Sequence, residues 1–443
     1  MSNKKSTDLI IKDGLTVTVN PKEDVLQNAS IVIKHGLILD IDTPETIDGK
    51  YTAPQTIDAS KKIVMPGLVN THTHSAMTVF RGFADDIPLR AWLMDNIFPL
   101  EERFVSPKMV KTGMSLAIAE MIMSGTTTFN DMYYYQGDAA DIVKKMGMRA
   151  LLTESIADFK VPNSKDYLES IKYSKALAEN YKNDSLITIG ASVHAPYTSN
   201  PEILLAVKEF TDSNNLIFDI HVAETQWEIE TIQKKYGKSP VKFLDDLRIL
   251  NQRTVAAHSI HLNSEDIEIY KNRQVGVAHN PECNMKISSG ISPVPQFLAN
   301  GIKVGLGTDG AASNNNLDMF EEMHTMALLH KLSSGNPTTL TARQAVRIAT
   351  MGGAEVLGME NEIGSIEKGK KADIITLDID NVRATPMYDP YSALVYSLNG
   401  SDVCDSVIDG KLVMQGGSLV HNSLEEVIRE ANICAEDVRQ KFK

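Results

Sequence analysis

Short apolar runs recur through the middle of the chain and alternate with longer segments of helical period. Strands that alternate with helices indicate a parallel sheet. Eight such strands match a closed (β/α)8 barrel of the TIM type, so we expect an α/β fold. The predicted strands cover residues 67–70, 126–131, 150–153, 188–193, 217–222, 254–258, 276–279 and 303–307, and the clearest helical patterns cover residues 107–124, 138–145, 167–181, 201–213 and 264–272.

Both ends of the chain have a different pattern, with short apolar strands separated by tight turns. Asp-Gly turns at 13–14 and 409–410 each separate two such strands, which predicts hairpins. Each end is too small for a secure core of its own, so we expect both ends to fold together into one small β-sandwich beside the barrel. The predicted division is residues 1–63 for the first part of the sandwich, 64–365 for the barrel, and 366–443 for the second part of the sandwich with a terminal helix.

The composition fits a folded protein that does not bind nucleic acid. Of the 443 residues, 42% are hydrophobic and 23% are charged, enough apolar material for a large core. The 44 lysines and arginines against 57 aspartates and glutamates give a net charge of −13, whereas phosphate binding needs a basic face. No stretch approaches the roughly 20 apolar residues of a membrane span. We therefore expect neither a nucleic-acid nor a membrane partner.

The cysteines and the N-terminal segment indicate a cytoplasmic protein. Cys283, Cys404 and Cys434 cannot all pair with one another, and none forms a Cys-x-x-Cys motif. Residues 1–8 contain two lysines, but no apolar segment of a signal peptide follows them. A reducing compartment fits this pattern.

Titratable side chains follow several predicted barrel strands. His72 and His74 come after the first strand, where residues i and i+2 point to the same side. Because the carboxyl ends of barrel strands meet at one face, these two side chains should meet His221 and Asp309. His194 and His258 follow other strands in the same way. Three imidazoles and a carboxylate suit one divalent ion, so we expect His72, His74, His221 and Asp309 to bind zinc, with Fe²⁺ or Mn²⁺ as alternatives.

Several motifs follow one another in order along the chain. They are VMPGLVNTHTH at 64–74, HVAET at 221–225, AAHSIHL at 256–262, HNP at 279–281, GLGTDGAASN at 305–314 and the segment 364–373. Together they resemble the amidohydrolase superfamily in its mononuclear branch, and within this branch the chain is most similar to the 5-methylthioadenosine/S-adenosylhomocysteine deaminases. The resemblance covers essentially the whole chain and implies hydrolytic deamination of an adenine nucleoside, with release of ammonia and the inosine analogue.

The resemblance also implies roles at the reacting atoms. Glu224 would move protons between the attacking water and the ring nitrogen, and its place three residues after His221 agrees with this role. His258 would orient the water without binding the metal. Asp309 would act as a base as well as a ligand.

Three further residues are expected to contact the nucleoside. His194 resembles the substrate-contacting histidine of nucleoside deaminases, and Glu101 matches the position that holds ribose hydroxyls. Trp92 offers an aromatic face to a base or thioether. The simpler interpretations are a hydrogen-bonded wall residue for His194, a surface glutamate for Glu101 and core packing for Trp92.

Two departures from the relatives bear on the substrate. Glu154 stands where an arginine would meet the carboxylate of S-adenosylhomocysteine, which favours 5-methylthioadenosine or 5-deoxyadenosine over the homocysteine conjugate. Lys160 and Lys165 follow closely in the chain, so the alternative that a lysine binds this carboxylate in place of the arginine stays open. Adenosine is a further candidate substrate. Cys283 stands where relatives usually have serine, and we expect it to alter the pocket rim.

Alternative functions remain at this stage. One is a guanine aminohydrolase, or a triazine aminohydrolase or chlorohydrolase, of the same branch. Another is a catalytically silent barrel with a binding role, which the presence of all four ligands, Glu224 and His258 disfavours. The expected partner is a small nucleoside, and a homodimer or higher homo-oligomer is the default for a large barrel.

Overall fold

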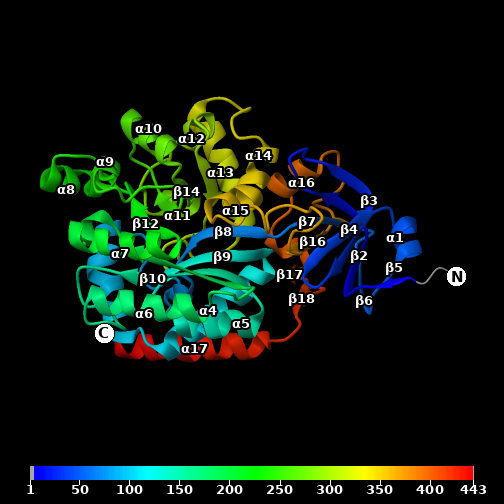
Figure 1. The fold of residues 1–443 in the computed structure, drawn as a ribbon, viewed down its shortest axis with the longest axis horizontal. Helices are drawn as coiled ribbons and strands as arrows, with labels where there is room; N and C mark the ends of the chain where they lie inside the picture. Colours follow the sequence, from blue (N-terminus) through cyan, green and yellow to red (C-terminus); the bar gives the residue numbers. More distant parts are fainter. Residues whose placement is uncertain (1–3, 443) are drawn as a thin grey trace.

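A closed barrel of eight parallel strands forms the centre of the computed structural model, which describes residues 4–442 (Figure 1). The strands follow one another around the barrel in chain order, and the last pairs with the first. All eight predicted strands are therefore confirmed, and with them the (β/α)8 fold. They are β8 (Leu68–Thr73), β9 (Thr126–Tyr133), β10 (Arg149–Ile156), β11 (Ile187–Val193), β12 (Phe218–Val222), β13 (Thr254–His258), β14 (Gly276–His279) and β15 (Lys303–Leu306).

Helices between the strands cover the outside of the barrel. Several begin at a polar residue whose side chain accepts a hydrogen bond from the backbone of the first turn, which fixes where each helix starts. Ser106, Asp166 and Asn200 cap α4, α6 and α7 in this way. The principal helices are α4 (Pro107–Met123), α5 (Gln136–Met146), α6 (Tyr167–Asn180), α7 (Pro201–Asn214), α8 (Gln226–Tyr236), α9 (Pro240–Asp246), α10 (Ser264–Arg273), α11 (Pro281–Lys286), α12 (Val294–Ala299), α13 (Met319–Ser334) and α14 (Ala342–Arg347).

The two chain ends form one mixed sheet of nine strands, on the right in Figure 1. Its central pair joins the two ends, because β7 from the N-terminal part pairs antiparallel with β16 from the C-terminal part. This confirms a small β-domain built from both ends. The strands are β2 (Leu9–Val17), β3 (Val25–Lys34), β4 (Leu37–Asp42), β6 (Gln55–Asp58), β7 (Lys62–Pro66), β16 (Ile374–Asp378), β17 (Val403–Ile408), β18 (Lys411–Gln415) and β19 (Ser418–Leu419).

The predicted boundaries at 63/64 and 365/366 stay predictions. Strand β7 runs across the first of them and continues through Gly67 directly into barrel strand β8. A Cβ atom at Gly67 would lie 2.0 Å from Thr127 Oγ1, so the close approach of β9 requires glycine at this junction. The end sheet and the first barrel strand are thus linked without a flexible connection.

Two further contacts fasten the terminal segments to the barrel. Arg149 on β10 makes a bidentate ion pair with Asp373, at 2.6 and 2.9 Å, beneath the barrel. Both side chains are almost completely buried. Helix α17 (Leu424–Lys441) lies along the barrel beside α4, at the bottom of Figure 1, and buries Ala431 and Val438. Met1–Asn3 and Lys443 lie outside the described residues.

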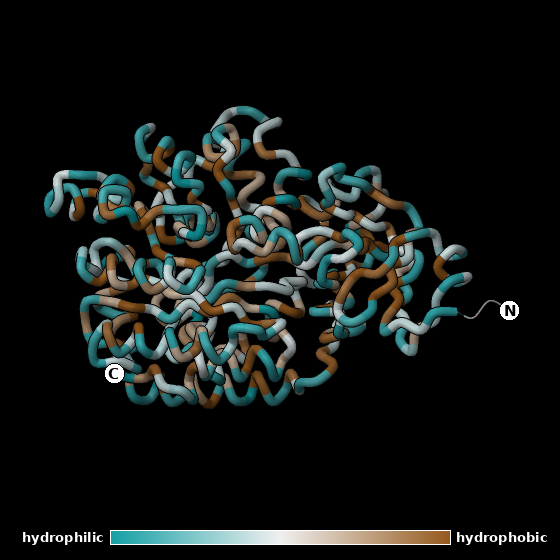
Figure 2. The backbone as a smooth tube through the Cα atoms, in the orientation of Figure 1, coloured by the Kyte–Doolittle hydropathy of each residue, from teal (hydrophilic) through white to brown (hydrophobic). Residues whose placement is uncertain are grey.

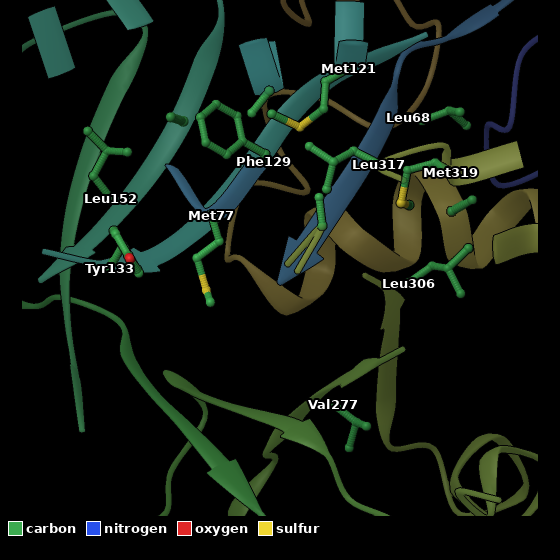
Figure 3. Close-up of a cluster of buried hydrophobic side chains, with 14 of the residues drawn as sticks. Leu68, Met77, Met121, Phe129, Tyr133, Leu152, Val277, Leu306, Leu317 and Met319 are labelled. Atoms are coloured by element: carbon green, nitrogen blue, oxygen red, sulfur yellow. The ribbon is translucent and has the colours of Figure 1, made fainter. Parts of the chain in front are cut away.

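The main core lies between the barrel strands and their helices. Apolar segments follow the strands and the inner faces of the helices in Figure 2. Figure 3 shows part of the core, with Phe129 of β9, Leu152 of β10, Met121 of α4 and Met319 of α13, all fully buried. None of the helices within residues 4–442 combines the length and apolar character that a bilayer crossing requires.

Candidate metal centre and active site

The structure brings four side chains together at the carboxyl ends of the barrel strands. His72 lies at the end of β8, His74 directly after it, His221 on β12, and Asp309 after β15. His72 Nε2 lies 3.1 Å from His221 Nε2 and 3.7 Å from Asp309 Oδ1. His74 Nε2 lies 3.2 Å from the same oxygen. The ligand atoms of His72, His74 and Asp309 lie within 4.8 Å of one another, as do those of His72, His221 and His258, so His72 belongs to two groups that could each hold an ion.

Backbone carbonyls orient two of the imidazoles. His74 Nδ1 donates to the carbonyl of Met132 at 2.6 Å, and His221 Nδ1 donates to the carbonyl of His194 at 2.6 Å. Because a carbonyl only accepts, the proton must sit on Nδ1, which leaves the Nε2 lone pair for a metal. His72 Nδ1 is buried without a hydrogen-bond partner among the described residues and lies 4.0 Å from Asp219 Oδ2.

The charges of the cluster also fit a cation. Burial lowers the pKa of His72 and of His221 well below the usual value, so both are neutral and able to ligate. Burial lowers the pKa of His74 too, but the facing Asp309 outweighs it and raises that pKa to about 9. Although burial acts to raise the pKa of Asp309, the ion pair with His74 holds it well below its usual range. Two neutral imidazoles, together with a third whose proton faces an ionised carboxylate, are a donor set for one divalent metal ion, which would take the place of that proton.

Two more titratable groups face this cluster. His258 Nε2 lies 3.9 Å from Asp309 Oδ2 and 4.0 Å from Glu224 Oε1. Its other nitrogen, Nδ1, is engaged by Asn284 Oδ1 at 2.8 Å, which fixes the ring. Glu224 is buried, and this burial raises the pKa of its carboxyl. Such a group can hold or release a proton closer to neutral pH than a surface glutamate.

The cluster opens into a pocket that every predicted site residue except His72 lines. His72 lies beneath it and is fully buried. A helical segment consisting of α2 (Leu89–Ala91), η2 (Trp92–Ile97) and α3 (Phe98–Phe104) forms one wall. The predicted residues on the wall are His74, Trp92, Glu101, His194, His221, Glu224, His258 and Asp309.

The three residues predicted to contact a nucleoside all line this pocket. Glu101 lies in α3 and is buried, and burial raises its pKa to about 7. It is therefore not the surface glutamate of the simpler interpretation. Trp92 is buried in the hydrophobic core and also lines the pocket, so both interpretations of this residue agree with its position. His194 Nδ1 is 3.0 Å from Thr198 Oγ1, and burial lowers its pKa to about 4.

Two expectations about the pocket are wrong. Glu154 does not line it: one carboxylate oxygen accepts from Gln136 N at 3.0 Å and the other from Asn163 Nδ2 at 2.8 Å. Its carboxyl group is thus bound by a backbone N–H and a side-chain amide away from the pocket, and it gives no reason to exclude S-adenosylhomocysteine. Cys283 is not at the rim either, because it is fully buried against Asp309.

The sequence analysis missed several residues that hold the site in place. Cys283 Sγ donates to Asp309 Oδ2 at 2.8 Å, and Ser313 Oγ donates to the same oxygen at 3.3 Å. Glu228 accepts from two backbone groups beside Glu224. Only Ser313 lies within one of the motifs given above, and no spacing along the chain indicates such contacts.

The chain belongs to the amidohydrolase family, whose model matches residues 63–413. It is 41% identical to a 5-methylthioadenosine/S-adenosylhomocysteine deaminase of Thermodesulfovibrio yellowstonii, over 97% of this chain and 98% of that protein. It is 42% identical to a 5'-deoxyadenosine deaminase of Methanosarcina acetivorans, again over 97% and 98% of the two chains. A crystal structure of an adenosine deaminase from Xanthomonas campestris with bound zinc matches with a TM-score of 0.97 at 34% identity, over 99% of this chain and 100% of that one.

Proposed function

We propose that this protein is a metal-dependent hydrolase that deaminates adenine nucleosides. Water supplies the oxygen that replaces the 6-amino group, and the products are ammonia and the inosine analogue. The observation that carries the proposal is one pocket in which the histidine–aspartate cluster, Glu224 and His258 face the same space as Glu101. The three relatives described above support the nucleoside class, since all are named as deaminases of adenosine or its 5′-derivatives.

His72, His74, His221 and Asp309 would hold the metal ion, and zinc is the ion we favour, with Fe²⁺ or Mn²⁺ as alternatives. The zinc bound in the Xanthomonas campestris deaminase supports this choice. When bound, such an ion lowers the pKa of a water molecule so that it can attack at neutral pH.

The surrounding side chains move and place the protons. Glu224, with its raised pKa, gives a proton to the ring nitrogen and takes one from the attacking water. His258 Nε2 faces both Glu224 and Asp309, which suits it to orient that water. Asp309 remains ionised and acts as the base for the second proton, which it takes from the hydroxyl group added to the ring carbon and passes to the departing amino group, so that ammonia leaves.

The nucleoside lies between the metal cluster and the helical wall. His194 contacts the adenine ring, Trp92 offers its ring face, and Glu101 accepts from the ribose hydroxyls when ionised. Glu101 also lines an adjoining outer cleft, together with Phe159 and Lys160. This cleft gives room for a 5′ substituent, from a methylthio group to the homocysteine of S-adenosylhomocysteine.

An ultraviolet assay tests the proposal. We expect zinc-loaded protein to convert the absorbance of 5-methylthioadenosine to that of a hypoxanthine and to release ammonia. Glu224→Gln should abolish both signals while the metal stays bound, because only the proton carrier is changed. The exposed Glu230→Gln on α8 is the matched control and should keep full activity. The four substrates to test are 5-methylthioadenosine, S-adenosylhomocysteine, adenosine and 5-deoxyadenosine. If metal-loaded protein releases ammonia from none of them, the proposal is contradicted and guanine or a triazine is favoured as the substrate.

Two broader expectations belong to the same proposal. A homodimer or higher homo-oligomer should appear in analytical ultracentrifugation as a species of at least twice 48.8 kDa. The cysteine pattern supports a cytoplasmic location, which fractionation of the source cells tests.

A further inference from the structure

Glu228 is a buried carboxylate that the proposed reaction does not use. It lies in the first turn of α8 and is fully buried. Its Oε1 accepts from Ala223 N and its Oε2 from Glu224 N, both at 2.9 Å. One side chain therefore accepts hydrogen bonds from two consecutive backbone N–H groups. The second of these belongs to Glu224, the proposed proton carrier.

This arrangement is not an ordinary helix cap. Thr225 is the N-cap of α8, and its Oγ1 accepts from Glu228 N at 3.2 Å. In a capping box the glutamate at Glu228's position would bond back to the N–H of the cap residue itself. Glu228 instead reaches one and two residues further back, to Glu224 and Ala223. Its carboxylate thus acts on the loop that follows β12 rather than on the helix end.

The loop needs such support because its backbone is strained. Ala223 has a φ of +54°, a left-handed conformation that alanine rarely adopts. Its carbonyl accepts from Ile260 N at 3.1 Å and from His261 N at 2.9 Å, in the loop after β13. Because Glu228 accepts from the N–H of Ala223, both the N–H and the carbonyl of this residue are hydrogen-bonded. The turn at Ala223 directs the chain so that Glu224 lines the pocket.

Within residues 4–442 the carboxyl of Glu224 makes no hydrogen bond that would hold it in place, and His258 Nε2 lies 4.0 Å from its Oε1. The position of this carboxyl therefore depends on the backbone that carries it. We propose that Glu228 is a positioning residue for Glu224, holding the strained turn that aims the proton carrier at the substrate. This inference rests on the proposed function.

Kinetics of Glu228→Gln test the inference with 5-methylthioadenosine and zinc-loaded enzyme. The amide keeps the shape of the side chain but has only one acceptor oxygen, so an NH₂ group would face a backbone N–H. We expect kcat to fall about 10- to 100-fold because the proton carrier is displaced. KM should change less than about threefold, since the nucleoside contacts are intact. The metal content should stay the same, and Glu230→Gln on the exposed face of the same helix should behave as wild type.

A second readout does not depend on activity. Hydrogen exchange of the peptide covering residues 221–228 should become faster in Glu228→Gln and stay unchanged in Glu230→Gln, because one of the two backbone N–H groups loses its buried acceptor. If Glu228→Gln does not fold, Glu228→Asp keeps the charge with a shorter reach and should show the same loss of kcat and faster exchange. Unchanged exchange, or an unchanged kcat in a variant with a lower melting temperature, would overturn the inference. A wild-type enzyme without deaminase activity would instead refute the proposed function, and the exchange result would still decide the role of Glu228.

Discussion

At the scale of single residues, Asp309 is held by donors on both of its oxygens. Gly310 N donates to Oδ1 at 2.8 Å, and Cys283 and Ser313 donate to Oδ2. A buried carboxylate that loses a donor is costly, about 1.5–3 kcal/mol for a hydrogen bond to a charged group. The orientation of this metal-facing side chain therefore depends on a cysteine thiol.

We accordingly predict different effects of two changes at Cys283. Cys283→Ala should lower the melting temperature and weaken zinc binding, measured by competition with a chelator, because Oδ2 loses its nearest donor. Cys283→Ser should retain both properties, since a hydroxyl donates to the same oxygen. Cys434→Ala, in the partly exposed face of α17, is the matched control. Equal zinc affinity in the alanine and serine variants would contradict this role.

At the scale of elements, Glu154 joins β10 to the helix and loop that surround it. Burial raises the pKa of its carboxyl from 4.5 to about 8. Between about pH 4.5 and pH 8 the folded protein thus keeps a proton that the unfolded chain releases. By linkage, the contribution of this group to the free energy of unfolding decreases as the pH rises through this window.

Replacing Glu154 should therefore change the pH dependence of stability. We predict that the melting temperature of Glu154→Gln falls less between pH 5.5 and pH 8 than that of the wild type. The exposed Glu169→Gln on α6 should keep the wild-type dependence. Parallel curves for wild type and Glu154→Gln, recorded by scanning calorimetry, would show that this carboxyl does not titrate in the window.

At the scale of the whole molecule, the Arg149–Asp373 ion pair is a buried link between the barrel and the end sheet. Removing one partner of such a pair costs about 3–5 kcal/mol, because the other charge stays buried without compensation. We predict this loss for Arg149→Met in denaturant unfolding. Arg273→Met breaks an exposed pair with the same 2.6 Å N–O distance, to Asp245, and should cost at most about 1 kcal/mol. Similar losses in both variants would argue against a special role of the buried link.

Much of this molecule was predictable from its sequence, for a physical reason. Most barrel strands are buried on both faces and rich in apolar residues, and polar side chains of the candidate site follow at their ends. This pattern indicated that His221 and Asp309 lie at the carboxyl ends of two strands, where the structure has them. Contacts across loops, such as those of Cys283 and Glu228, have no signal in local spacing. Glu154 was misplaced for the same reason, since only the surrounding loop shows which way its side chain turns.

The pairing of β7 with β16 has a consequence for how the protein is made. The two strands are about 300 residues apart, so β7 leaves the ribosome long before its partner exists. During that time β7 has an open edge, of the kind that invites pairing with other chains. Strand β8, which carries His72, continues directly from β7. The strand that carries His72 is therefore anchored to a sheet that is completed only after all eight barrel strands have been made, and a chain cut before residue 374 would leave the proposed metal centre attached to an unfinished sheet.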